Sequence, residues 1–194
     1  MSHHIQRFTD ENLFSIVEIQ REALGVGLMS HLPSRTRLRY LAWLTHHREV
    51  TTWVATDDNG ETRGVLVVSP TQLSRPVCLN LELACTAAVV VLRNPKRWPI
   101  LWHELRRDRS RDGQCQRSIS LFAVAHEARS NGVGSQLLET AIRKEVDEGM
   151  TTLCTTTHNS RLVEHYRRRY SADIVQVNRL KAYDSYNLII KLLK

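Results

Sequence analysis

Apolar positions along this chain follow two periods, and together they predict a mixture of helices and strands. The run Ile119–Ala125 is almost continuously apolar, which is typical of a buried strand. Shortly after it, apolar residues recur on one helical face, at Val133, Leu137, Leu138, Ala141, Ile142 and Val146. A polar loop with two glycines, Gly132 and Gly134, joins these segments. The other predicted elements are arranged around this strand–loop–helix unit.

Further elements are predicted on both sides of the unit. Before it we expect a strand, two helices and a hairpin, namely Ile5–Phe8, Thr9 or Asp10 to about Leu24, Pro33 or Ser34 to about His46, and Thr51–Thr56 with Thr62–Ser69. After it we expect a strand, a helix and a closing strand pair, namely Thr151–Thr157, Asn159–Arg169, and Ile174–Val177 with Asn187–Leu193. The pattern predicts a single α/β domain over residues 1–194.

The interval 70–117 is long for a connection inside a compact domain. Two helical patterns fit it, Cys78–Leu92 and Pro99–Arg109, and prolines separate them. Because the interval also contains Trp98 and Trp102, we expect it to pack against the rest of the domain as a helical insertion.

Charge and composition restrict the classes of partner. The net charge is +7, which fits a solvated basic face, a field that attracts a small anionic ligand, or nucleic-acid binding. The basic clusters Arg93–Arg117 and Arg161–Arg169 lack interleaved aromatic residues, which weighs against nucleic acid. The longest apolar run, Ala84–Leu92, is too short to span a bilayer. We therefore predict a protein without a membrane segment.

The cysteines suggest neither a metal site nor a disulfide. Cys78, Cys85, Cys115 and Cys154 show no close paired spacing. The sequence therefore predicts a cytoplasmic protein with reduced thiols and no bound metal.

The glycine loop predicts an anion site. A helix that begins directly after it presents backbone amides without intrahelical partners, and the helix dipole adds partial positive charge there. Two familiar phosphate motifs do not fit. The third glycine of the dinucleotide fingerprint is missing, and no Gly-Lys-Ser/Thr of a P-loop follows Gly134.

The loop Arg129-x-x-Gly132-x-Gly134 resembles the acetyl-CoA motif of the GNAT superfamily of N-acetyltransferases. Downstream, Asn159 and Tyr166 reproduce the superfamily's Asn-x-x-x-x-x-x-Tyr spacing. The resemblance implies a GNAT fold of the α/β (α+β) class. Its central, mostly antiparallel mixed sheet would have about seven strands, with the fourth and fifth splayed apart. Helices would flank the sheet, and the insertion 70–117 would lie between the third and fourth strands.

The resemblance also implies the site. The pyrophosphate of acetyl-CoA, the co-substrate, would bind to the glycine loop, at Arg129, Ser130, Asn131, Gly132, Val133, Gly134 and Ser135. Its pantetheine arm would run along Phe122, Ala123 and Val124, and Asn159 would also contact it. A free amine would attack directly while a backbone amide stabilises the oxyanion, and Tyr166 would protonate the leaving thiolate.

The general base and the acceptor stay open. Some family members carry a glutamate five residues before the asparagine, where this chain has Cys154. The remaining candidates for the base are His126, His158, Glu82 or a water chain.

The predicted acceptor is a small primary amine, such as an amino sugar or a nucleotide-linked amino sugar. The insertion, as a lid or wall, and residues of the second helix would line its pocket, with candidates at Arg35, Arg37, Arg39, Tyr40 and Trp43. Two alternatives are a protein or peptide amine acetyltransferase and a non-catalytic acetyl-CoA-binding module. A homodimer is left open.

Overall fold

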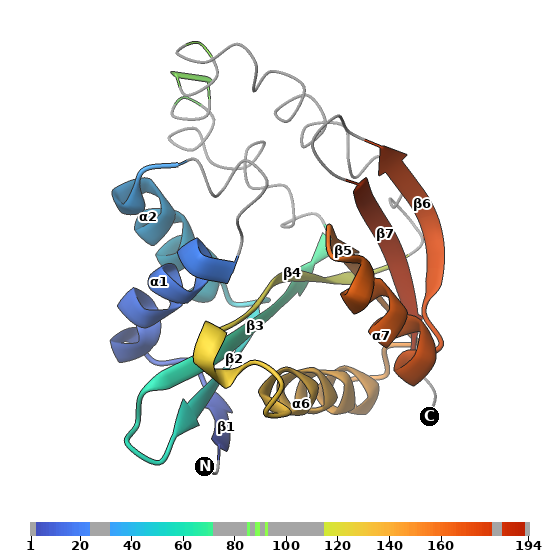
Figure 1. The fold of residues 1–194 in the computed structure, drawn as a ribbon, viewed down its shortest axis with the longest axis horizontal. Helices are drawn as coiled ribbons and strands as arrows, with labels where there is room; N and C mark the ends of the chain where they lie inside the picture. The colour runs from blue at the N-terminus through green and yellow to red at the C-terminus, as the bar shows by residue number, and fades with distance from the viewer. Residues whose placement is uncertain are drawn as a thin grey trace.

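The structure is a computed structural model that describes residues 3–23, 32–71, 115–179 and 184–192, and also Cys85, Ala88, Val89 and Leu92. These residues contain a seven-stranded sheet with helices packed on it (Figure 1). The strands are β1 (His3–Arg7), β2 (Thr51–Asp57), β3 (Thr62–Pro70), β4 (Arg117–Val124), β5 (Thr152–Thr157), β6 (Asp173–Arg179) and β7 (Asp184–Lys191). The α-helices with described bounds are α1 (Leu13–Ala23), α2 (Ser34–Thr45), α6 (Val133–Asp147) and α7 (Ser160–Tyr170).

The sheet is mixed, with the strand order β1-β2-β3-β4-β5-β7-β6. Its neighbouring strands are antiparallel except for the parallel pair β4–β5. This arrangement confirms the predicted fold class. Figure 1 shows α1 and α2 together on one side of the central strands and α6 on the other, and both α1 and α6 contact β3. Because both faces of β3 are covered, the side chains of Val65 to Val68 are fully buried.

Local signals explain several element boundaries. The backbone N–H of Thr9 donates to Oδ1 of Asn12 at 3.1 Å, at the short 3₁₀ helix that leads into α1. Pro33 stands at the N-cap of α2, where its missing N–H costs nothing. Gly60, in the predicted Asn-Gly turn between β2 and β3, has a φ of 82°. No helix among the described residues combines the length and apolar character that a membrane span requires.

The predicted insertion helices lie almost entirely outside the described residues. Within Cys78–Leu92 only Cys85, Ala88, Val89 and Leu92 are described, and all four are helical and exposed. Pro99–Arg109 lies wholly outside, so its helix stays a prediction.

Strands β4 and β5 pair only over a short distance. The paired residues are Arg117 with Leu153, Ser118 with Cys154, and Ile119 with Thr155. A register shift in the β3–β4 pairing leaves Ser120 as an extra residue in β4. Beyond Ile119 and Thr155, no further β4–β5 pair occurs in the described strands. The predicted splay between the fourth and fifth strands therefore begins at this point.

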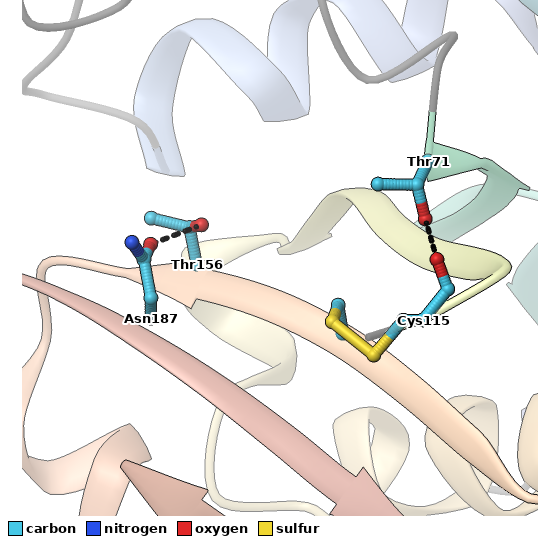
Figure 2. Close-up of a disulfide and its surroundings, with 5 residues drawn as sticks. Thr71, Cys115, Thr156 and Asn187 are labelled. Carbon is cyan, nitrogen blue, oxygen red and sulfur yellow. Dashed lines mark hydrogen bonds between the residues drawn. A yellow bond between two sulfur atoms is a disulfide. The ribbon is translucent and has the colours of Figure 1, made fainter. Parts of the chain in front are cut away.

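The expectation of reduced thiols is wrong for two cysteines, because Cys115 and Cys154 form a disulfide (Figure 2). Ser118 lies opposite Cys154 in the parallel β4–β5 pair, and the chain just before β4 places Cys115 at a Cα–Cα distance of 6.0 Å from Cys154. Thr71, directly after β3, supports the same corner. Its Oγ1 donates to the Cys115 carbonyl at 2.8 Å and its N–H to the Gln116 carbonyl at 3.0 Å. The described ends of the 70–117 interval are thus joined to each other and to β5.

We expect the double variant Cys115→Ser/Cys154→Ser to unfold at lower urea concentration than the oxidised protein. The cysteines are 39 residues apart, and a cross-link over a loop of that size lowers the entropy of the unfolded chain by an amount worth about 2–4 kcal/mol. Cys85→Ser serves as the control, because Cys85 is exposed and free. Thiol titration of the denatured protein should find two more thiols after reduction than before, and equal numbers would contradict the cross-link.

Candidate active site

The loop between β4 and α6 exposes the start of a long helix. After a 3₁₀ turn at His126–Ala128, Arg129, Ser130, Asn131 and Gly132 are all exposed. Gly132 is the N-cap of α6 and, being a glycine, has no side chain with which to cap this end. The N–H of Gln136 donates to the Gly132 carbonyl at 3.0 Å, so the amides of Val133, Gly134 and Ser135 precede the first intrahelical bond. This geometry suits an anion, and these residues are the predicted pyrophosphate ligands.

The two loop glycines are needed for different reasons. Gly132 has a φ of 81°, a left-handed conformation that residues with a Cβ adopt poorly, although no atom of the described residues would contact an added Cβ within 4 Å. Gly134 has no positive φ, but a Cβ there would lie 3.2 Å from Cζ of Phe122 and 3.5 Å from Cγ2 of Val124. The absent side chain at Gly134 therefore lets the first turn of α6 approach β4 closely.

Arg63 lies on β3, on the side of β4 that faces away from β5, and its side chain is hydrogen-bonded to the loop. Its Nε donates to Oδ2 of Asp57 at 2.8 Å, and its Nη1 donates to Oε1 of Glu127 at 2.7 Å, within the 3₁₀ turn. The hydrogen bond from Arg63 lowers the pKa of Asp57, so this carboxylate stays charged at neutral pH. On the opposite side, Nε of Arg129 donates to the Val124 carbonyl at 3.2 Å. The predicted phosphate-binding arginine is thus hydrogen-bonded to β4 in this structure.

Backbone amides of β4 point into the splay. The N–H of Ala125 donates to the Arg63 carbonyl at 2.9 Å, and the sides to which strand amides point alternate along an antiparallel pair. The amide of Ala123 is therefore directed to β3, whereas those of Phe122 and Val124 are directed toward the side from which β5 has separated. Two of the three predicted pantetheine-binding residues thus present free-edge amides, and Ala123 belongs to the β3 ladder.

Helix α7 places Tyr166 beneath the start of the splay. Asn159 caps this helix, its Oδ1 accepting from the N–H of Arg161 at 3.0 Å. Two turns later the Tyr166 side chain is 1% exposed, and its hydroxyl shares a hydrogen bond with the side chain of Thr155. Burial raises the pKa of Tyr166, so the hydroxyl keeps its proton. Thr155 is the last β5 residue paired with β4.

The three residues considered for the general base lie in different surroundings. His126 is exposed at the 3₁₀ turn, His158 is half-buried before Asn159, and Glu82 lies outside the described residues. Cys154 is unsuitable as a base because its sulfur is in the disulfide. No carboxylate therefore occupies the position on β5 that some family members use.

The predicted acceptor residues of α2 divide into two groups. Arg35 and Arg39 are exposed and Trp43 is half-buried, whereas Arg37 and Tyr40 are buried. Nη2 of Arg37 donates to Oγ of Ser34 at 3.2 Å.

A comparison with protein families identifies the domain. The model of the acetyltransferase (GNAT) family matches residues 13–170. The chain belongs to this family. Members of the GNAT family are N-acetyltransferases that generally use acetyl-CoA as co-substrate, and the loop, splay and helix described above all lie within the matched region. No curated protein sequence matches the chain significantly.

Solved GNAT structures show the same fold at low sequence identity. The ribosomal-protein-S18-alanine N-acetyltransferase from Escherichia coli is 11% identical over 100% of this chain and 96% of that one, with a TM-score of 0.63. A mosquito arylalkylamine N-acetyltransferase like 5b is 14% identical over 99% and 100%, with a TM-score of 0.67. A histone acetyltransferase HPA2 and related acetyltransferase from Corynebacterium glutamicum is 17% identical over 100% and 98%, also with a TM-score of 0.67. At these identities the comparison establishes the fold of this GNAT protein.

Proposed function

We propose that this GNAT protein transfers the acetyl group of acetyl-CoA directly to a primary amine of a small molecule. The observation that supports this most is the position of Tyr166. Its buried, protonated hydroxyl is hydrogen-bonded to Thr155, the residue at which β4 and β5 separate. A proton donor therefore lies beside the opening through which a thioester would have to pass.

The proposed reaction uses backbone groups for binding and one side chain for proton transfer. Amides of Asn131–Ser135 bind the pyrophosphate, and the free-edge amides of Phe122 and Val124 donate to the pantetheine arm and the acetyl carbonyl. The amine nitrogen forms a bond to the carbonyl carbon, and the carbon–sulfur bond then breaks. Tyr166 donates its proton to the leaving thiolate, and the proton lost by the amine leaves through a base or water that stays unassigned.

An amino sugar or a nucleotide-linked amino sugar is the proposed acceptor. Two features support it, namely the long interval between β3 and β4 and the disulfide-bonded Cys154 in place of a carboxylate on β5. The structural neighbours bear the names of both protein and small-amine acetyltransferases, so they favour neither class of acceptor for this chain.

An amine panel with a thiol-release assay tests this choice. We expect free or nucleotide-linked amino sugars to stimulate the release of coenzyme A at a saturable rate, and the protein itself to carry no acetyl group when acetyl-CoA is added without an amine. If only peptide N-termini were acetylated, the acceptor would be a protein or peptide and not a small molecule. Saturable acetyl-CoA binding without turnover of any amine would point to a non-catalytic binding module.

The cytoplasmic location and the homodimer of this protein are both proposals. A cytoplasmic location was predicted together with reduced thiols, and the Cys115–Cys154 disulfide weighs against it because disulfides persist mainly in oxidising compartments. A homodimer is compatible with the edge strand β6, whose Ile174, Val175 and Val177 are partly exposed.

A further inference from the structure

The sheet consists of two parts that meet at one pair of strands. Strands β1 to β4 are paired with one another, and so are β5, β7 and β6, whereas the parallel β4–β5 pair joins the two sets in the described sheet. We call the first set the N-terminal half-sheet and the second the C-terminal half-sheet. The helices follow the same division, since α6 packs mainly on β1 to β4 and α7 on β5 and β7 (Figure 1).

The groups of the proposed reaction, on which this inference rests, are divided between the two half-sheets. The glycine loop and the free-edge amides of Phe122 and Val124 belong to the N-terminal half-sheet and its helix α6. Tyr166 lies on α7, and Thr155, to which its hydroxyl is hydrogen-bonded, lies on β5. The distance from the Tyr166 hydroxyl to a bound thioester therefore depends on how the two half-sheets are held relative to each other.

The junction between the half-sheets is short, and a disulfide crosses it. Three residue pairs join β4 to β5, and the strands separate beyond Ile119 and Thr155. The bond between Cys115, just before β4, and Cys154 on β5 spans this junction (Figure 2). Cys115 is 6% exposed and Cys154 is fully buried. Because Cys154 directly precedes Thr155, the cross-link lies next to the residue that is hydrogen-bonded to Tyr166.

The non-covalent contacts across the junction constrain it less narrowly. Arg169 of α7 forms an ion pair with Glu139 of α6, but both side chains are open to solvent, where such pairs contribute little. Apolar residues of both half-sheets, such as Leu66 and Leu188, share one hydrophobic core, so the halves stay packed together without the disulfide. A disulfide fixes the spacing of two strands more tightly, because its bond lengths and angles are specific.

We propose that the Cys115–Cys154 disulfide is a positioning cross-link, which holds the half-sheets at the spacing from which Tyr166 reaches the leaving thiolate. Acetyl transfer then depends on the oxidation state of the two cysteines. A dithiol reduces the bond with two electrons. One reductant thiolate attacks a sulfur of the disulfide, and the second closes a cyclic disulfide on the reductant and leaves both cysteines as thiols. The reduced protein still binds acetyl-CoA, because the N-terminal half-sheet and α6 supply the binding amides.

Kinetics of the oxidised and the dithiothreitol-reduced protein test the proposal, with glucosamine as the amine. The acetylated product is measured by mass spectrometry, since a thiol assay would also detect the reductant. We expect reduction to lower kcat by about tenfold or more, because a misplacement of about 1 Å can cost about 10²-fold, and to leave the Kd for acetyl-CoA little changed. Reoxidation with glutathione disulfide should restore kcat. Cys115→Ser/Cys154→Ser should show the low kcat under both conditions.

Hydrogen exchange of the same samples gives a readout that does not require turnover. Peptides from β4 and β5 should exchange faster after reduction, because the short junction opens more easily without its cross-link. Peptides from β2 and β3 should exchange at the same rate in both states. Alkylation followed by mass measurement confirms that the buried disulfide has been reduced, since the reduced protein then carries two more alkyl groups.

Two variants serve as controls. Cys85→Ser removes an exposed free thiol and should respond to dithiothreitol as the unmodified protein does. Ile16→Ala removes a fully buried side chain from α1, away from the junction, and should lower stability to a degree comparable with loss of the disulfide while keeping kcat.

Three results would overturn the inference. They are an unchanged kcat or unchanged exchange of β4 and β5 after reduction, a Kd for acetyl-CoA that rises as much as kcat falls, and an equal loss of kcat in Ile16→Ala. An oxidised protein that turns over neither glucosamine nor any other amine of the panel would refute the proposed function instead. Hydrogen exchange would then still show whether the disulfide holds the half-sheets together.

Discussion

Tyr166→Phe is expected to lower kcat by about 10²- to 10⁴-fold, the usual contribution of general-acid catalysis, while the Kd for acetyl-CoA changes little. The hydroxyl matters only as the carbon–sulfur bond breaks, whereas the proposed binding of the co-substrate relies on backbone amides of β4 and α6. Steady-state kinetics combined with calorimetric titration of acetyl-CoA measures the two quantities separately.

Tyr170→Phe is the matched control for this experiment. Tyr170 ends the same helix and its ring is half-buried, but it has no part in the proposed site. Loss of its hydroxyl should leave kcat unchanged. Near-normal turnover in folded Tyr166→Phe would remove Tyr166 from the mechanism, and the thiolate would then take its proton from water or from the amine.

The raised pKa of Tyr166 also predicts a pH profile. Its folded-state pKa lies above the ordinary value of 10.0, so the hydroxyl is protonated in both folded and unfolded chains at neutral pH. Its burial therefore costs no stability at neutral pH and destabilises the fold only as the pH rises past the unfolded pKa. Any change in kcat between pH 6 and 9 should thus originate from a group other than Tyr166 and persist in the residual activity of Tyr166→Phe.

Gly132→Val is expected to raise the Kd for acetyl-CoA by at least about tenfold. A β-branched residue does not adopt the φ of 81° at Gly132 without strain, so the loop must change and the amides of Val133, Gly134 and Ser135 lose their alignment. A hydrogen bond to a charged group is worth about 1.5–3 kcal/mol, so the loss of a single one gives a change of this size. Isothermal titration of the folded variant measures it.

Gly149→Val controls for strain alone. Gly149 has the same φ of 81° and equally open surroundings, but it follows the other end of α6. Both variants should lose similar stability, and only Gly132→Val should lose affinity. An equal Kd in the two variants would show that the loop does not bind the pyrophosphate. Gly134→Val is a less specific probe, because its side chain would displace the ring of Phe122.

The sequence by itself determined the elements and the position of the glycine loop. Each depends on residues close together in the chain. The Asn59-Gly60 turn, the caps at Thr9 and Asn159, and the helical face that begins at Val133 all occur where local rules predict them. The order of these elements, with the spacing from Asn159 to Tyr166, was enough to predict the family. Whether Tyr166 was buried could not be read from that spacing, since burial depends on what packs against α7.

Only the tertiary structure decided which distant residues became neighbours. Cys115 and Cys154 show no recognisable spacing, and they meet because the start of β4 pairs with β5 beside Cys154 and the preceding residues place Cys115 next to it. The same applies to Arg63, which reaches Glu127 across the sheet, and to Thr156, Asn187 and Gln176, which are hydrogen-bonded across three strands. Periodicity along the chain shows which residues share a face of one element. It carries no information on the register between strands, and register determines which side chains of β5 and β7 meet at the splay.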